Sequence, residues 1–372
     1  MISFLKKTKY LKALYVYLQT LFVILQYHYL KAKYLFRKPF MKDTYRIRKL
    51  EKSDTILYCG TDYAQDYSGF IPALKKLFNV VLFYKEDGSY GVYKGSVFDA
   101  SVSEQNFQKI RALILEHKPR VLLMQSWGFR LSHNHLCMIR HEFKELIIGN
   151  ICMDDRHSFY HYGSKKRGSA GLLPYLDFTM VTAPEIVHWH KCHGVHSVYF
   201  PLASDPDIFF PVNQVKKYDV GFVGANYGVR SDLINALQKS GLIVKAYGNG
   251  WPSGRLPLEK TNQFYNECRI VLGVSTILGA KNFCSMKLRD FDVPMSGNVY
   301  LTLKTEELSN IFDEGDEILF YKNKHDLVTV ANMLAKNDNK IMKIGAMARE
   351  KAFKMHAYDI RLENTFKLVG IM

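Results

Sequence analysis

The chain has 372 residues, of which 48% are hydrophobic and 23% are charged. This length suits two globular domains, and this composition excludes a disordered or fibrous protein. Lysine and arginine outnumber aspartate and glutamate by 51 to 35, and the six cysteines form no C-x-x-C pair, which argues against a disulfide scaffold and a zinc ribbon and favours a reducing compartment.

The positive charge is concentrated in residues 1–50, which contain twelve lysines and arginines and one acidic residue, Asp43. The remaining residues are only mildly basic. A nucleic-acid-binding protein usually spreads its basic side chains over a folded face or along a groove. We therefore expect no nucleic-acid partner, and we interpret 1–50 as a basic, aromatic helical segment.

Eighteen uncharged residues lie between Lys12 and Lys31, a length at the threshold for a transmembrane helix. Three interpretations are open: an in-plane anchor on an anionic membrane, a helix packed on the protein itself, and a membrane span. The anchor is favoured by basic residues on both flanks and by a polar stripe with a seven-residue repeat, formed by Lys12, Gln19, Gln26 and Lys33. The protein would then be cytoplasmic and peripheral on the inner face of the membrane. The basic residues expected at the headgroups are Lys6, Lys7, Lys9, Lys12, Lys31, Lys33, Arg37 and Lys38.

From Asp54 onward, short apolar runs alternate with helical patterns, which is typical of parallel α/β sheets. Strands are predicted in the first half at 55–60, 79–85, 119–126, 146–153, 178–183 and 195–203. Helices are predicted there at 69–77, 103–117 and 184–193. The last helix and its surroundings hold His188, His190, Cys192, His193 and His196, without a complete metal-ligand set. We interpret them as solvated side chains of a surface helix.

The alternation restarts after residues 204–217, which contain two prolines and read as a connector. Strands are predicted in the second half at 218–225, 242–248, 270–275, 298–303 and 317–322. Helices are predicted at 230–241, 262–269, 286–297 and 305–312, and from there to Met372 the chain is expected to be helical. The predicted domains are 1–50, 51–203, the connector 204–217, 218–350 and a helix at 351–372 that returns to the first domain.

Four stretches of the second half resemble the carboxyl-terminal domain of GT-B-fold glycosyltransferases, and most closely the CgeB-like group of that class. They are YDVGFVGANYGVR (218–230), KAYGNGW (245–251), SMKLRDFDVPMSGNVYLT (285–302), and FDEGDEILFYKN with the later KMHAYDIRL. The resemblance implies two doubly wound Rossmann-like domains that face a cleft. It also implies sugar transfer from a nucleotide-diphosphate sugar to a hydroxyl of a glycan or lipid-linked acceptor, as in cell-surface polysaccharide synthesis.

The resemblance places the donor site on residues that follow strands or start helices. The implied donor-binding residues are Gly224, Arg230, Ser275, Lys287, Arg289 and Asp292. Arginine, lysine and helix amino termini stabilise the diphosphate leaving group in metal-independent transferases, so neither a metal nor a cofactor is expected. Asp292 stands where the family usually has glutamate, and Cys284 occupies the position of its second acidic residue, which leaves the stereochemistry of transfer open.

A base that deprotonates the acceptor hydroxyl is expected from the first half. Asp154, Asp155 and His157 directly follow a buried strand and are the favoured candidates, while Asp62 and Asp66 in an earlier loop are the second choice. Paired aspartates also raise the alternative of a metal site.

The sequence also bears on two other classes of function, a nicotinamide-dependent enzyme and a non-catalytic scaffold. A nicotinamide enzyme is disfavoured, because the turn GFVGANYG does not fit G-x-G-x-x-G and the second strand of that half ends without an acidic residue. The alternative that stays open is a catalytically inactive, membrane-associated scaffold built on a transferase fold.

Overall fold

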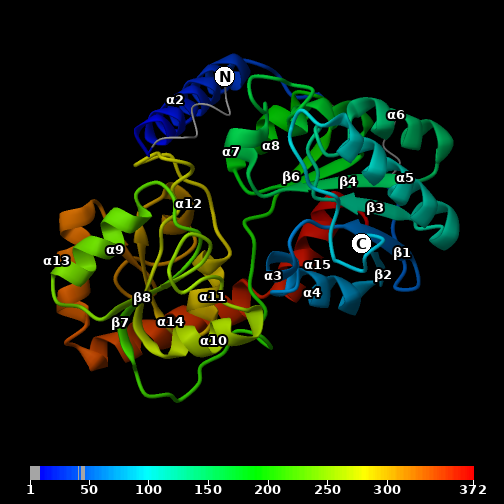
Figure 1. The fold of residues 1–372 in the computed structure, drawn as a ribbon. Coiled ribbons are helices and arrows are strands. Elements are labelled where there is room, and N and C mark those ends of the chain that lie inside the picture. Colours follow the sequence, from blue (N-terminus) through cyan, green and yellow to red (C-terminus); the bar gives the residue numbers. More distant parts are fainter. Residues whose placement is uncertain (1–8, 41, 43–46) are drawn as a thin grey trace. The chain divides into compact units, whose positions relative to one another are not determined.

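The structure is a computed structural model that describes residues 9–40, 42 and 47–372 (Figure 1). The chain divides into two compact units. The N-unit comprises Phe22–Pro201 and Arg361–Met372, and the C-unit comprises Met1–Leu21 and Leu202–Ile360. Each unit contains one parallel β-sheet with helices, so the predicted α/β class with two doubly wound sheets is confirmed.

The sheet of the N-unit has six parallel strands in the order β2-β1-β3-β4-β5-β6. The strands are β1 (Thr55–Cys59), β2 (Asn79–Leu82), β3 (Val121–Met124), β4 (Ile147–Cys152), β5 (Phe178–Val181) and β6 (His196–Tyr199). All six lie within the predicted ranges. Every residue of β3 and β4 is buried, which explains their continuous apolar sequences, because a central parallel strand is covered on both faces.

The N-unit helices include one that the sequence did not predict, α6 (His133–Glu142). Only Leu136 and Ile139 of α6 are buried, so its apolar periodicity is weak. The other helices of this unit are α3 (Tyr63–Asp66), α4 (Phe70–Leu77), α5 (Ala100–His117), α7 (Asp155–Ser158), α8 (Pro184–Lys191), the larger part of α15 (Tyr358–Val369), and the 3₁₀ turns η1 (Ser169–Gly171) and η2 (Leu173–Tyr175).

The sheet of the C-unit has five parallel strands in the order β11-β10-β9-β7-β8. The strands are β7 (Tyr218–Val223), β8 (Val244–Tyr247), β9 (Cys268–Leu272), β10 (Val299–Leu303) and β11 (Leu319–Tyr321). β9 begins and ends earlier than the predicted 270–275. The chain leaves the sheet after Leu272 because Thr276 pairs in an antiparallel bridge with Cys284, which folds 276–284 into a separate loop.

The C-unit helices cover both faces of this sheet (Figure 1). They are α9 (Arg230–Lys239), α10 (Leu258–Asn266), α11 (Arg289–Met295), α12 (Glu306–Ser309), α13 (Lys324–Leu334) and α14 (Asp338–Met355). α9 packs on α13, and α11 packs on α14. A core of strand residues such as Phe222 and Leu301 joins Leu237 of α9 and Leu327 of α13, which packs α9 against the sheet.

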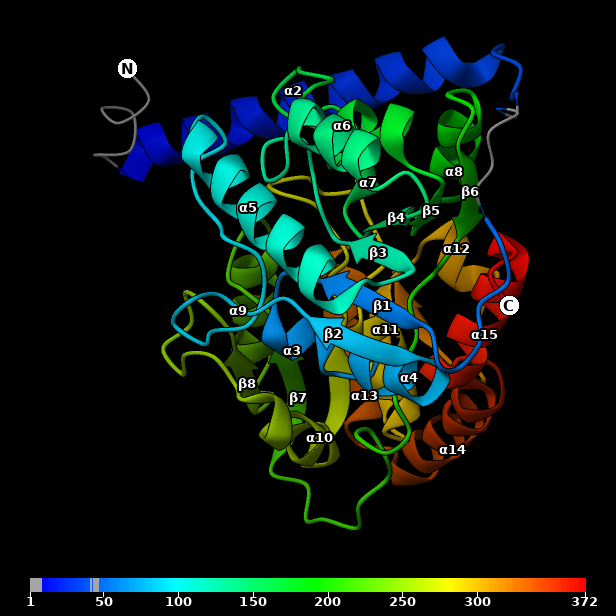
Figure 2. The ribbon, with the colours of Figure 1, turned by 90° about the vertical axis from the view of Figure 1, so that its right-hand side faces the viewer.

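The basic amino-terminal segment forms α2 (Lys9–Leu35) (Figure 2). Within the N-unit, α2 packs on α8, where the Tyr34 ring stacks on Trp189 at 5.4 Å and the Tyr27 hydroxyl donates to Glu185 at 2.7 Å. Gln26 of the predicted polar stripe also faces the protein and donates to the Tyr160 carbonyl at 2.7 Å. Among the described residues, no helix has the length and apolar character that crossing a bilayer requires.

The interpretation of the histidines around α8 as solvated is wrong. The His188 ring bonds the Tyr34 carbonyl, the His193 ring bonds the Tyr34 hydroxyl, and the His196 ring bonds the Leu368 carbonyl. His190 is fully buried against Thr179, and its burial lowers its pKa to about 3. These rings are covered because α2 and the carboxyl terminus pack here, which a local helix pattern cannot reveal.

Candidate functional site

The switch point of the C-unit sheet lies between β7 and β9, because the chain leaves β7 toward β8 on one side and reaches β9 on the other. Ligands of open α/β sheets bind beyond the carboxyl ends of the strands at such a point. Two arginines converge on this position. Arg230 begins α9 after the turn that follows β7, and Arg289 begins α11 after the loop that follows β9.

Both arginines donate to backbone carbonyls at the ends of the two strands. The Arg289 guanidinium donates to the Val223 carbonyl at 2.5 Å and to the Val274 carbonyl at 3.4 Å. Arg230 donates to the same Val274 carbonyl at 3.2 Å and to Ala225 at 2.8 Å. The two guanidinium carbons lie 5.5 and 5.1 Å from the centre of one phenyl ring, that of Phe222. This shared environment sets the two positive charges side by side.

Among the described residues, neither arginine takes part in an ion pair, and the Nε atoms of both are buried without a hydrogen-bond partner. Against the effect of burial, nearby tyrosines and Asp290 raise the pKa of Arg289. Arg230 is only 3% exposed. Its burial and the adjacent charge of Arg289 lower the pKa of Arg230 to about 10. Two adjacent guanidinium groups at a sheet switch point have the charge and the donors to bind an anion with more than one negative charge.

Gly224 allows the backbone to pass between these side chains. A Cβ atom at this position would lie 2.8 Å from the Arg289 Nη1 atom and 3.3 Å from the Arg230 Nη1 atom. The Trp251 indole closes the other side by donating to the Gly224 carbonyl at 2.8 Å. A larger residue at 224 would therefore displace the guanidinium groups, which gives this glycine a direct role in shaping the site.

Ser275 and Lys287 lie on the loop that carries Arg289. The Ser275 carbonyl accepts from the Ser285 amide at 3.0 Å, and the Lys287 ammonium donates to the Ser285 hydroxyl at 2.6 Å. The Ser275 and Thr276 hydroxyls are buried without a hydrogen-bond partner. Lys287 is half-buried and adds a third positive charge on this loop. The structure thus brings Gly224, Arg230 and Arg289 together with the segment Val274–Ser275 that follows β9, and Lys287 lies on the same loop.

Asp292 is buried, as are Arg230 and Ser275 among the predicted donor residues. It is 5% exposed, and burial raises the pKa of its carboxyl well above the usual range. Asp290, one of the two aspartates in the first turn of α11, accepts from the Lys287 amide and the Tyr300 hydroxyl, both at 2.7 Å. These contacts give Asp290 a structural role in fixing the start of α11.

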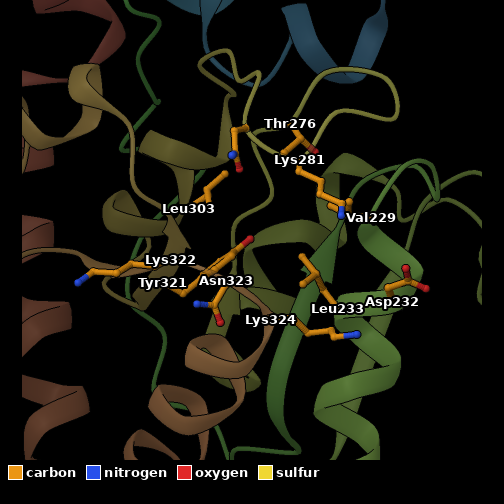
Figure 3. Close-up of a pocket in the computed structure, with 11 residues that line it drawn as sticks. Val229, Asp232, Leu233, Thr276, Lys281, Leu303, Tyr321, Lys322, Asn323 and Lys324 are labelled. Carbon is orange, nitrogen blue, oxygen red and sulfur yellow. The ribbon is translucent and has the colours of Figure 1, made fainter. Parts of the chain in front are cut away.

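A cavity of about 320 Å³ lies within the C-unit, and Val229, which precedes Arg230, is one of its lining residues (Figure 3). Its walls come from the start of α9, the loop 276–282, the end of β10 and the start of α13. The Tyr227 hydroxyl connects the two regions, because it accepts from Arg230 at 2.8 Å and lies 3.4 Å from the carbonyl of Thr276, a wall residue. Three lysines that the sequence reasoning missed line the cavity, namely Lys281, Lys322 and Lys324.

The predicted base candidates occupy the carboxyl end of β4 in the N-unit. Asp155 is 1% exposed, and its Oδ2 atom accepts from the Thr182 amide at 2.9 Å. Burial raises the pKa of the Asp155 carboxyl to about 8. Asp154 and His157 are half-buried, so both keep part of their surface accessible. Asp66, of the second-choice pair, is fully buried and accepts from the Tyr90 hydroxyl at 2.7 Å.

Across the described ranges of the chain, no group of three or more His, Cys, Asp and Glu side chains is arranged to hold a metal ion.

Residues 230–367 match a protein family described as glycosyl transferase-like. This segment contains Arg230, the loop after β9, Arg289 and most of the cavity wall. No curated protein sequence matches the chain significantly.

Solved structures share the fold of the chain at low sequence identity. Sucrose-phosphate synthase from Thermosynechococcus elongatus has a TM-score of 0.61 at 9% identity, over 85% of this chain and 98% of that one. HepE (Alr3699) from Anabaena, solved with UDP, has a TM-score of 0.56 at 10% identity, over 84% and 99%. The β-glucosyltransferase of phage T4, solved with UDP-glucose, has a TM-score of 0.52 at 14% identity, over 86% and 100%. The fold is therefore that of the GT-B glycosyltransferases.

Proposed function

We propose that this chain, which has the fold of GT-B glycosyltransferases, transfers a sugar from a nucleotide-diphosphate sugar to a hydroxyl of a glycan or lipid-linked acceptor. The reaction would serve cell-surface polysaccharide synthesis. The observation that carries this proposal is the pair Arg230 and Arg289, two adjacent guanidinium groups that form no ion pair among the described residues and lie at the switch point of the C-unit sheet. The diphosphate of the donor is the anion that such a pair fits.

The leaving diphosphate gains negative charge as the sugar departs. Arg230 and Arg289 are already fixed by carbonyls at the ends of β7 and β9, so they stabilise this charge without reorganising. We propose that they replace a metal ion in this role, with Lys287 as an additional donor. The neighbouring cavity of about 320 Å³ then takes the nucleoside or the sugar.

The acceptor hydroxyl must lose a proton if it attacks the sugar directly. We propose Asp154 or His157 of the N-unit for this step, because both are partly accessible at the end of β4. Asp155 is less suited to contact a substrate, since it is buried and its Oδ2 atom is bonded to the Thr182 amide. We propose that Asp155 instead positions the segment that carries Asp154 and His157.

The test is a transfer and hydrolysis assay against a panel of nucleotide-diphosphate sugars, with calorimetry for binding. We expect one donor to bind and to be hydrolysed slowly without an acceptor, with activity retained in excess chelator. If activity is lost in chelator and restored by Mn²⁺, the metal-independent mechanism is wrong. If no nucleotide binds, the alternative of an inactive scaffold on a transferase fold replaces the enzyme.

The location that we propose is cytoplasmic, at the inner surface of the membrane. The side of α2 away from the protein is apolar, with spacing of three and four residues that places these side chains on one helix face. They are Leu14, Tyr17, Leu18, Leu21, Leu25 and Tyr29, between 42% and 64% exposed. Exposed Lys31, Lys33, Arg37 and Lys38 follow this face. Lys6 and Lys7, and the side chains of Lys9 and Lys12, lie outside the described residues.

An apolar face beside several cations fits an anionic bilayer surface, where each basic residue contributes about 1 kcal/mol. The double substitution Leu18→Glu and Leu25→Glu should abolish pelleting with vesicles that contain phosphatidylglycerol, and high salt should release the wild type. Leu115→Glu is the matched control, because Leu115 on α5 is 49% exposed and lies outside this face. Wild type that only detergent extracts, or equal pelleting of the double variant, would exclude a peripheral anchor at this face.

A further inference from the structure

The N-unit has its own cationic cluster at the carboxyl edge of its sheet. The sheet order puts the switch point between β1 and β3, and the segment Trp127–Arg130 directly follows β3. The Arg130 guanidinium carbon lies 4.6 Å from the centre of the Trp127 ring and 5.5 Å from that of Phe129. The His161 ring stacks on both, at 5.7 and 5.0 Å. Each of the four side chains is half-buried, so the cluster retains an accessible surface.

The charge of Arg130 is not compensated by an ion pair. Among the described residues, its guanidinium has no hydrogen bond or salt bridge, and its Nε atom is buried without a partner. Burial lowers the pKa of Arg130, and the nearby Asp154 carboxylate opposes this effect. The His161 ring is neutral at pH 7, because burial and the charges of its neighbours lower its pKa to about 4. The cluster is therefore a single planar cation held between aromatic rings.

A basic hairpin packs against this cluster and fixes its shape. His161 and Ser164 pair across a two-residue turn, in which Tyr162 and Gly163 have φ of 46° and 69°. A Cβ atom on Gly128 would lie 1.8 Å from the Lys166 carbonyl, so only glycine lets the hairpin approach the Trp127–Arg130 turn. The hairpin carries exposed Lys165 and Lys166, which make the surroundings of Arg130 more positive.

The same hairpin is bonded to α2 within the N-unit. Gln26 donates to the Tyr160 carbonyl at 2.7 Å and accepts from the Gly163 amide at 3.1 Å. The Lys33 ammonium lies 5.9 Å from the centre of the Tyr160 ring. The hairpin is thus attached to the helix whose opposite, apolar side is the proposed membrane contact. A ligand at Arg130 would be held next to that helix.

We propose that Trp127, Phe129, Arg130 and His161 form a subsite for a phosphate group of the acceptor. This inference rests on the proposed function, and it narrows the acceptor to a phosphate-bearing molecule. The guanidinium supplies a planar fork of donors that fits phosphate oxygens, and the rings exclude water from one side of the contact. Neutral His161 has a ring nitrogen that can donate to the same anion.

The experiment measures binding of geranyl diphosphate, inorganic pyrophosphate and geraniol by calorimetry, with UDP at saturation so that Arg230 and Arg289 are occupied. We expect geranyl diphosphate to bind more tightly than pyrophosphate if a lipid bears the phosphate, and equally if the phosphate alone is recognised. Geraniol should not bind. Arg130→Ala should weaken both phosphate probes about 10- to 100-fold, the scale of a lost charge-assisted contact.

Arg111→Ala is the control, because Arg111 on α5 is in an ion pair with Glu142 and its loss changes the net charge equally. Unchanged probe affinity in Arg130→Ala, or an equal loss in Arg111→Ala, would overturn the subsite. If the alanine variant unfolds, Arg130→Lys serves instead, and retention of full affinity there would exclude the stacked planar cation. The affinity for UDP is measured in every variant and reports on the donor site. If the proposed function is wrong, UDP will not bind; if only the subsite is wrong, UDP will bind and the phosphate probes will not respond to Arg130→Ala.

Discussion

The substitution Arg289→Ala tests the donor site most directly. The guanidinium donates to the carbonyls of Val223 and Val274, and we propose that its remaining donors contact the diphosphate. A hydrogen bond to a charged group contributes about 1.5–3 kcal/mol, so the variant should bind a nucleoside diphosphate roughly 10- to 100-fold more weakly. Removal of the like charge beside Arg230 offsets part of this loss, which favours the lower part of the range.

Isothermal titration with the matching nucleoside distinguishes loss of the phosphate contact from a general disturbance of the nucleotide site. The nucleoside lacks phosphates, so it should bind the variant and the wild type equally. Arg349→Ala is the matched control. Arg349 is in the same unit and donates to the Phe209 and Met295 carbonyls at 3.0 and 2.6 Å, so its loss should cost folding stability without changing nucleotide affinity. An unchanged diphosphate affinity in Arg289→Ala, or an equal loss of nucleoside affinity, would refute the assignment.

Two further predictions concern the end of β4. The pKa of Asp155 is raised to about 8, so the native state keeps a proton that the unfolded state releases, and the stability of the wild type falls as the pH rises toward 8. Asp155→Asn removes this loss. In urea unfolding, the variant should therefore gain about 1 kcal/mol or more relative to the wild type between pH 5 and pH 8. A pH-independent difference would contradict this. Asp154→Asn or His157→Ala should lower kcat about 10²- to 10⁴-fold at unchanged donor affinity, and full activity of both variants would place the base elsewhere.

Much of the fold follows from local sequence patterns. The two runs of alternating strands and helices predicted two parallel sheets, and buried strands such as β3 and β4 are apolar throughout. Boundaries were less accurate where long-range pairing decides them. α10 begins directly after Pro257, four residues before the predicted start, and the predicted terminal helical run is broken where Ala357 bridges to Ser204. The sequence around Ala357 contains no signal for that bridge.

The candidate site was predictable only in part, because long-range contacts complete it. Arg230 and Arg289 could be proposed because the resemblance to GT-B glycosyltransferases covers them, and because both lie near the start of a predicted helix that follows a strand. Their shared contact with Val274 depends on the strand order, which brings β7 and β9 together. The environment of Arg130 needs two loops, Trp127–Arg130 and the hairpin around His161. A signal was present in the W-G-F-R sequence after a buried strand, but its partner lies some thirty residues later.

Aromatic contacts explain why these arginines remain available to a ligand. A carboxylate beside a buried guanidinium would neutralise it, and an incoming phosphate would then have to displace that ion pair. Phe222 and Tyr227 beside Arg230, and Trp127 beside Arg130, instead attract the cation through their ring faces and leave its charge in place. The cost appears as the lowered pKa of both arginines, which a bound anion would reverse. Substituting glutamate for the half-buried Trp127 should therefore abolish binding of the phosphate probes in the N-unit while retaining the Arg130 guanidinium.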